Sequence, residues 1–272
     1  MIRISIVKPN DLSYAEMDEL KSFEMRFKYP IGDRKFSICH GMNNGSYTQF
    51  FESLGKVKLI VIRNQGKVVG LGCAILRTVK NNKEKQKFWY LCDFKISKDF
   101  QNKKILNKLF YKLVIPFYIR SKKMVAFNMS PPGKSVLLRK ARSIFKWFNL
   151  DAKKGVFFEM TYYEYVENKD KFKEYLLYTN YGEKDIVIDG EISPIVHLVE
   201  KDHAKINLNK TNLVSEDSNS GMDLLNKSII MIMTTDEKEA IRLSEFMTPS
   251  AIGTLISKSI NVDNLKFSSA EV

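Results

Sequence analysis

The spacing of apolar and polar positions predicts a chain that alternates strands with helices up to about residue 166. Residues 2–7 alternate polar and apolar side chains and stop at Pro9-Asn10, which is typical of a short strand. Two β-rich runs flank Asn64-Gln-Gly-Lys67 and predict a hairpin. Strands are predicted at 2–7, 57–63, 68–79, 88–96, 124–129 and 156–165. Helices are predicted from about Ser13 to before Pro30 and at 46–54, 103–118 and 135–148, and a loop at 31–45.

The remainder of the chain has a weaker pattern. Strands are predicted at 186–188, 195–199 and 229–234, and helices at 167–178, 236–246 and 249–259. Residues 207–226 are polar and predict a loop or linker, and the last dozen residues predict a loose tail. The sequence shows no internal repeat. We therefore predict a basic, aromatic-rich domain at 1–166 and a smaller acidic α/β region at 167–272.

Charge separates the same two parts. Of the 272 residues, the first 166 carry 32 Lys and Arg against 13 Asp and Glu, whereas the remainder carries 12 against 18. Between Lys98 and Lys154 there are 15 basic residues and two acids. Such a stretch either is a solvated surface or attracts an anion: a phosphate-bearing cofactor, an acidic carrier protein or nucleic acid. Charge alone does not choose among these, and no nucleic-acid-binding motif accompanies it.

Composition excludes several classes. No apolar run is long enough for a membrane span, and the first residues do not resemble a signal peptide. Three cysteines without a CxxC pair make a disulfide framework or a cysteine zinc site improbable, so we expect a cytoplasmic protein. His197 and His203 fit no zinc spacing, and the glycines form no Walker or Rossmann pattern. We expect no metal.

The informative stretch runs from Cys92 to Phe110 and predicts a strand, a turn and the start of a helix. A helix N-terminus offers free backbone N–H groups to phosphate, and Lys103 and Lys104 lie there. The stretch resembles motif A of the GNAT-type N-acyltransferase superfamily, with Ile96 at the position of its valine and Gln101 at that of its Gln/Arg. Lys104 and Leu106 occupy the places of its two small residues. The order of elements over residues 1–166 is also similar.

The resemblance implies a fold, a donor and a set of contacts. It implies an α/β (α+β) fold, with a twisted mixed sheet flanked by helices, and transfer of an acyl group from acetyl-CoA or another acyl-CoA to an amine. The pyrophosphate is expected on the backbone of a segment that consists of Gln101, Asn102, Lys103, Lys104, Ile105 and Leu106. The pantetheine arm is expected beside Phe94 and Ile96. Asn128 occupies the place of an asparagine that often ends the next strand in this superfamily.

Attack of an amine on a thioester needs a group that takes its proton and a group that protonates the thiolate. Asp93 is the first candidate, because it stands on an apolar strand; alternatively it forms an ion pair with Lys95 or Arg77. Glu159 is the second acid on a predicted core strand, where it would line an acceptor pocket with Tyr162 and Tyr163; aromatic residues of a strand more often serve packing. Ser130 would assist the leaving thiolate or cap a turn beside two prolines.

The sequence leaves three functions open. The first is an N-acyltransferase acting on an unidentified small-molecule or macromolecular amine, with the acidic region forming part of the acceptor site or a homodimer contact. A variant takes its acyl group from an acyl-carrier protein. The second is a non-catalytic scaffold that binds a ligand or partner, suggested by the loss of the small residues at 104 and 106. The third is nucleic-acid binding, which charge alone suggests. The acceptor is not predicted.

Overall fold

The structure is a computed structural model. It describes residues 2–31, 34–41, 46–80, 84–101, 105, 108–109, 111–112, 115–129, 134, 138–139, 142–143, 150–260, 265 and 267–272. In these ranges, no helix is both long and apolar enough to cross a membrane.

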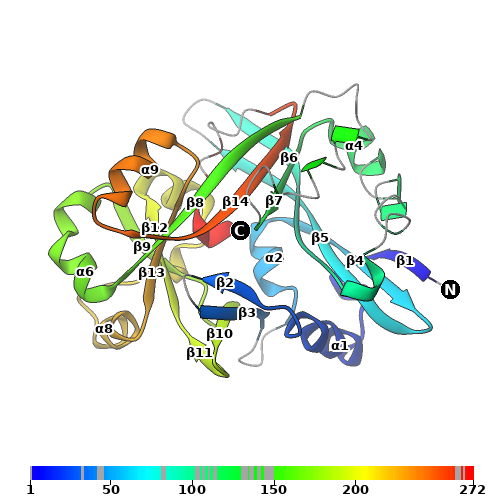
Figure 1. Cartoon of the computed structure of the whole chain (residues 1–272), viewed down its shortest axis with the longest axis horizontal. Coiled ribbons are helices and arrows are strands. Elements are labelled where there is room, and N and C mark those ends of the chain that lie inside the picture. Colours follow the sequence, from blue (N-terminus) through cyan, green and yellow to red (C-terminus); the bar gives the residue numbers. More distant parts are fainter. Residues whose placement is uncertain are drawn as a thin grey trace.

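A twisted mixed sheet runs through the whole molecule (Figure 1). In spatial order its described strands are β1 (Ile2–Val7), β4 (Lys56–Asn64), β5 (Lys67–Lys80), β6 (Lys85–Ile96), β7 (Met124–Asn128), β14 (Thr248–Lys258), β8 (Asp151–Thr161), β13 (Ile229–Thr234), β12 (Ile195–Glu200) and β9 (Tyr175–Thr179). The predicted hairpin is β4–β5, and its turn places Gln65 at φ 49° and Gly66 at φ 82°. Both central residues of the turn thus have positive φ, as a two-residue hairpin favours.

Outward from the centre of the large sheet, the parallel and antiparallel pairings follow the same order on both sides. β6 and β7 are parallel, as are β13 and β12, and each parallel pair is flanked by antiparallel neighbours. β14 and β8 form the antiparallel centre, where β14 pairs with β7 and β8 pairs with β13. The fold therefore contains a two-fold repeat that the sequence does not reveal. Sheet hydrogen bonds cross the predicted boundary at residue 166, and the division into two domains stays a prediction.

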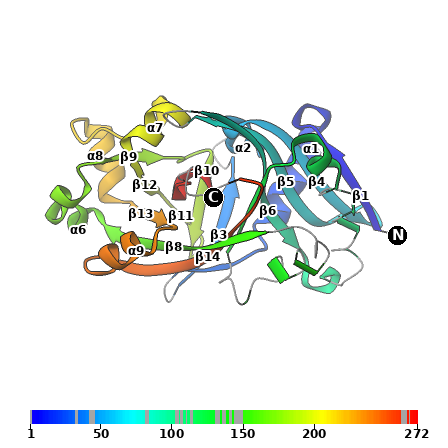
Figure 2. The ribbon, with the colours of Figure 1, turned by 90° about the horizontal axis from the view of Figure 1, so that it is seen from above.

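A smaller sheet joins strands from the first and second halves of the chain (Figure 2). Its strands are β11 (Glu191–Ser193), β10 (Lys184–Ile188), β3 (Arg34–His40) and β2 (Tyr29–Ile31). β10 pairs antiparallel with β3, from Lys184 opposite His40 to Ile188 opposite Phe36. The β10–β11 hairpin, from the second half of the chain, is thereby hydrogen-bonded to a strand of the first half.

Helices flank the large sheet. The described helices are α1 (Tyr14–Glu24), α2 (Gln49–Leu54), α4 (Ile115–Ser121), α6 (Tyr162–Glu167), α7 (Lys201–Asn207), α8 (Asn219–Asn226) and α9 (Glu237–Ser244). α1 begins with a capping box in which the Ser13 side chain accepts from the Glu16 N–H, and the Glu16 carboxylate accepts from the Ser13 N–H. The fold prediction is confirmed: a twisted mixed sheet is flanked by helices.

Four local predictions are wrong. The loop at 31–45 contains β3, and the loop at 207–226 contains α8. The helix at 167–178 begins earlier, as α6, because Thr161 and Glu164 form a capping box, and the chain then enters β9. The helix at 249–259 is β14, which lies between two strands and is buried on both faces from Gly253 to Ser257, so its sequence lacks the period of two that marks a half-exposed strand.

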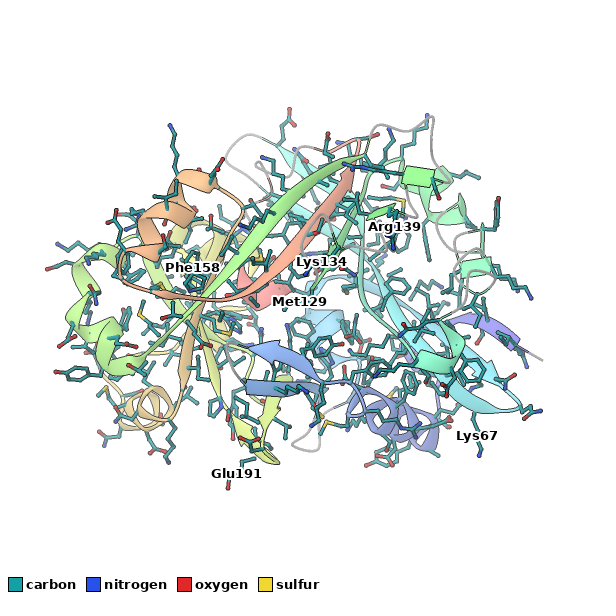
Figure 3. All side chains as sticks on the ribbon, viewed as in Figure 1. Lys67, Met129, Lys134, Arg139, Phe158 and Glu191 are labelled. Carbon is teal, nitrogen blue, oxygen red and sulfur yellow. The ribbon has the colours of Figure 1, made fainter. Side chains whose placement is uncertain are left out.

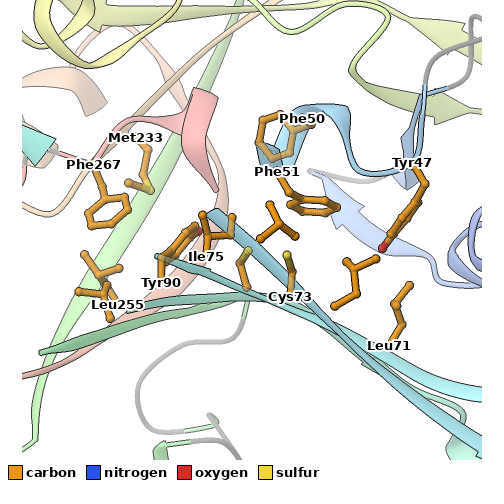
Figure 4. Close-up of a cluster of buried hydrophobic side chains, with 14 of the residues drawn as sticks. Tyr47, Phe50, Phe51, Leu71, Cys73, Ile75, Tyr90, Met233, Leu255 and Phe267 are labelled. Atoms are coloured by element: carbon orange, nitrogen blue, oxygen red, sulfur yellow. The ribbon is translucent and has the colours of Figure 1, made fainter. Parts of the chain in front are cut away.

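The predicted loose tail is also wrong, because residues 267–272 fold back into the centre of the molecule, where Figure 1 places the C-terminal end. Glu271 is 1% exposed, and its carboxylate contacts the Arg77 guanidinium and lies 2.8 Å from His203 Nε2. Phe267 packs against Tyr90, with 5.3 Å between ring centroids. Figure 4 shows these rings in the core that both halves share.

Candidate functional site

The site predicted around Asp93 begins with a bulge in β6. The β5–β6 register shifts between the pairs Leu71–Lys95 and Cys73–Cys92, so Asp93 and Phe94 together lie opposite Gly72. Asp93 takes a φ of 57°, in the left-handed region. A Cβ at Gly72 would lie 2.5 Å from the Phe94 ring, so only glycine leaves room for that ring.

Beyond the bulge, β6 separates from β7. The two strands pair only from Trp89–Met124 to Leu91–Ala126, although β6 continues to Ile96 and β7 to Asn128. Beyond that point β6 remains paired with β5, and β7 remains paired with β14. The inner edges of both strands therefore present backbone N–H and C=O groups that no strand of the described chain pairs.

Next to the bulge, three charged side chains form a buried cluster. The ammonium of Lys95 lies 2.8 Å from Glu24 Oε1 and also contacts the carboxylate of Asp93. The Tyr47 hydroxyl donates to Asp93 Oδ2 over 3.0 Å. Glu24 in turn accepts from the His40 backbone N–H and lies 2.8 Å from His40 Nδ1. The Asp93–Lys95 ion pair, one of the two expected alternatives, is thus present.

The elements around the cluster explain its burial. Glu24 is the last residue of α1, His40 ends β3, and Tyr47 lies two residues before the start of α2. The His40 ring packs on Phe51 with 4.4 Å between centroids. Figure 4 shows Tyr47 and Phe51 on the same face of β5 as Cys73. Three segments that lie 46 or more residues before Asp93 in the sequence thus close over the bulge.

Burial and ion pairing change the protonation equilibria in the cluster. Burial alone would raise the pKa of Glu24, but the neighbouring His40 ring and Lys95 ammonium hold this pKa down, at about 2. Burial opposes protonation of Lys95, yet Asp93 and Glu24 raise its pKa above the ordinary value. Burial and the adjacent Asp93 raise the pKa of Tyr47. We therefore assign a charged Glu24, a charged Lys95 and a neutral Tyr47 near pH 7.

Glu24, His40 and Asp93 also satisfy the spacing of a metal site, since their ligand atoms lie within 4.8 Å of one another. The Lys95 ammonium contacts two of the three, however, and its charge opposes that of a divalent cation. The donor set therefore fits an ammonium better than a metal ion.

The second half of the chain contributes Lys184. This residue lies on β10 opposite His40, and its Nζ lies 5.0 Å from the centroid of the Phe50 ring. It donates to the carbonyl oxygen of Val272. Burial lowers the pKa of Lys184 to about 8, although Asp93 acts in the opposite direction. An amine that is partly neutral near pH 8 thus faces the same interior as the cluster.

The structure brings some residues of the predicted donor site close to one another. Gln101 turns back and donates to the carbonyl of Ile96 over 2.7 Å, and Ile105 is buried under the sheet in the same cluster that Ile96 contacts. The Oδ1 of Asn128 is buried without a hydrogen-bond partner in the described residues. The predicted site residues that lie outside the described residues are Asn102, Lys103, Lys104, Leu106 and Ser130.

Glu159 lies elsewhere. It pairs in register with Thr248 at the start of β14, whereas Asn128 lies opposite Thr254, six residues further along that strand. Glu159 lines a separate cavity of about 410 Å³ with Phe246 and Thr248. The structure therefore does not bring Glu159 together with Asp93.

Sequence reasoning missed Glu24, His40, Tyr47 and Lys184 as neighbours of Asp93. The only local signal was a lysine at position 95 of a strand that is otherwise apolar, since a buried lysine requires an acidic partner. That signal identifies the neighbouring Asp93 as a partner but not Glu24, which is 71 residues away in the sequence.

No protein-family model matches the sequence, and no curated protein matches it either. Among solved structures, the chain is similar to a tandem GNAT protein from the clavulanic acid biosynthesis pathway, at 9% identity and a TM-score of 0.48 over 94% of this chain and 98% of that one. It is similar to a Pyrococcus horikoshii protein described as an acetyltransferase, at 14% identity and a TM-score of 0.46 over 98% and 96% of the two chains. A GNAT-family acetyltransferase from Streptococcus pneumoniae is 13% identical, with a TM-score of 0.38 over 57% and 88%. The function proposed below rests on the residues of this chain and not on these similarities.

Proposed function

We propose that this protein is an N-acyltransferase that moves an acyl group from acyl-CoA to an amine at the β6 bulge. The observation that carries the proposal is the separation of β6 from β7 beside Asp93. The open edges offer backbone groups to the amides of a pantetheine arm, and the unpartnered Asn128 Oδ1 offers an acceptor at the end of β7. Lys103 and Lys104, which the sequence places at the start of a predicted helix, would hold the phosphates.

The charges favour a cationic acceptor. The carboxylates of Glu24 and Asp93 share one lysine, which leaves an excess of one negative charge. An incoming ammonium therefore finds a negative environment and loses its proton to Asp93 or water before attack. The amine nitrogen then bonds to the thioester carbon, the C–S bond breaks, and the thiolate takes up a proton. Acetyl-CoA is the simplest donor for this reaction.

The first test is a calorimetric titration with acetyl-CoA and with CoA. Micromolar binding that weakens in Lys104→Glu, and not in Lys67→Glu, supports the donor site. Lys67 is exposed on the β4–β5 hairpin (Figure 3) and so provides the same charge change elsewhere. Absence of binding by the folded protein would overturn the CoA-dependent function and leave the carrier-protein donor.

The second test is thiol release in the presence of amines. Asp93→Asn should lower turnover at unchanged affinity for CoA, if Asp93 acts on the acceptor. The Asp93 carboxylate already contacts Lys95 and Tyr47, and this engagement favours a second candidate, a non-catalytic scaffold. Tight CoA binding without transfer to any cationic, neutral or anionic amine would select the scaffold.

A further inference from the structure

The two-fold repeat of the sheet places a second separation of parallel strands in the other half of the molecule. β12 and β13 pair only from Ile195–Ile229 to His197–Met231. β12 then continues to Glu200 beside β9, and β13 continues to Thr234 beside β8. Their inner edges at 198–200 and 232–234 therefore pair with no strand of the described chain.

A cavity of about 930 Å³ occupies this separation. Ile232 and Met233 both line it, although their side chains belong to the hydrophobic clusters on opposite faces of the sheet. The cavity thus passes through the sheet. One end lies against Ala240 of α9, and the other reaches Phe267, which Figure 4 shows beside Met233.

The chemistry of this cavity differs from that expected of a CoA site. After β6 the chain continues through the short helix η2 (Lys98–Phe100), and the sequence from Gln101 to Lys112 is rich in lysine. β12 instead passes directly into α7 at Lys201. Four acidic residues, Glu200, Asp236, Glu237 and Glu239, and two lysines, Lys153 and Lys154, line the cavity. The Glu239 carboxylate is paired with Arg242, so the other five lining charges sum to −1. Net negative charge disfavours a ligand that carries several phosphates.

We infer that this cavity is a second ligand site and that it binds an extended peptide segment with a basic residue. An extended chain of amides complements two strand edges that lack partners, as in recognition by strand addition. The apolar side chains of Leu198, Ile232 and Met233 then contact the peptide inside the sheet. The carboxylates at the α9 end face its cationic side chain. This site is independent of the function proposed above.

Hydrogen exchange of the full-length protein tests the site. The probe is the pentapeptide acetyl-Ala-Ala-Lys-Ala-Ala-amide at millimolar concentration, compared with its glutamate analogue and with CoA. The lysine peptide should slow amide exchange at 198–200 and 232–234. Glu237→Lys should weaken its binding roughly threefold to tenfold. Glu191→Lys, which makes the same charge change on exposed β11, should not.

A cavity-filling variant adds a steric test. Ala240→Phe should abolish protection by the peptide while a thermal melt shows that the protein remains folded. Three results would overturn the inference: no protection by the lysine peptide, equal protection by the glutamate peptide, or protection of these amides by CoA instead. Unchanged binding in both Glu237→Lys and Ala240→Phe would also overturn it.

Discussion

Replacing Lys95 by methionine tests whether the buried charge cluster holds the first half of the molecule together. The substitution keeps an unbranched side chain that is one atom shorter and removes its charge. Glu24 is 0% exposed and the Asp93 side chain 8%, so both carboxylates would remain buried after losing their common partner. We therefore expect Lys95→Met to destabilise the fold strongly.

The magnitude follows from the geometry. The ligand oxygens of Glu24 and Asp93 lie within 4.8 Å, and two like charges about 5 Å apart repel by roughly 3 kcal/mol at an effective dielectric constant of about 20. Breaking a buried ion pair costs about 3–5 kcal/mol by comparison. The variant can limit its loss by protonating one carboxylate, which costs about 3.7 kcal/mol at pH 7 for an ordinary pKa near 4.3. We expect a loss of about 4 kcal/mol at pH 7.

Urea denaturation at several pH values measures this loss. In the unchanged protein the pKa of Glu24 is lowered by folding, so its contribution is present above a pH of about 4.3 and disappears as the pH falls toward 2. In Lys95→Met the protonated carboxylate costs less as the pH falls, by about 1.4 kcal/mol per pH unit. The difference between the two proteins should therefore shrink by about 2.7 kcal/mol from pH 7 to pH 5.

The control is Lys67→Met, which removes a lysine from the exposed hairpin and should change stability by less than about 0.5 kcal/mol. A loss below about 1 kcal/mol in Lys95→Met, or a loss that does not depend on pH, would refute the reasoning. Glu24→Gln combined with Lys95→Met should recover part of the stability, because it removes one of the two opposed charges.

Three further predictions concern other parts of the core. Gly72→Ala should displace the Phe94 ring and cost about 1–3 kcal/mol in urea denaturation, with weaker CoA binding by calorimetry. Glu271→Gln should cost about 3–5 kcal/mol, since it leaves the buried Arg77 guanidinium without its anion; a melting curve measures it. Burial and the neighbouring thiol raise the pKa of Cys73, so a thiol reagent should label it only after unfolding.

Each of these has an outcome that contradicts it. Wild-type stability and CoA affinity in Gly72→Ala would show that the Phe94 ring does not need the space above glycine. Unchanged melting of Glu271→Gln, compared with the exposed-site variant Glu245→Gln, would mean that the final segment is not part of the core. Labelling of Cys73 in the folded protein, detected by peptide mass, would contradict its burial.

Local sequence signals predicted the first half of the fold well. The hairpin at Asn64-Gln-Gly-Lys67 and the strand that ends at Ile96 were predicted because turn residues and apolar alternation act over a few positions. The same signals failed at β14, which is buried on both faces and starts with Thr248-Pro249, so it lacks the alternation of a half-exposed strand. They also failed at residues 267–272, whose partners lie far away in the sequence.

The candidate site shows the same limit. Asp93 and the segment after Ile96 could be chosen from the sequence, because an acid on an apolar strand and lysines at a helix start are local features. The contacts of Asp93 in the folded protein could not all be predicted from the sequence. Its carboxylate contacts Lys95 and accepts a hydrogen bond from Tyr47, and Lys95 also contacts Glu24. Which charges meet in a core depends on how α1, β3 and α2 pack on the sheet.

The sequence by itself determined the mixed α/β class, the hairpin and the position of an acid beside a predicted phosphate-binding turn. Only the tertiary structure decided that β14 pairs with β7 and β8 with β13 at the centre of the sheet, that parallel strands separate twice, and that Lys95 pairs with both Glu24 and Asp93. The physical reason is the separation in sequence over which each effect acts. Propensity and periodicity act between residues a few positions apart, whereas strand pairing and buried ion pairs are selected by the free energy of the whole packed chain.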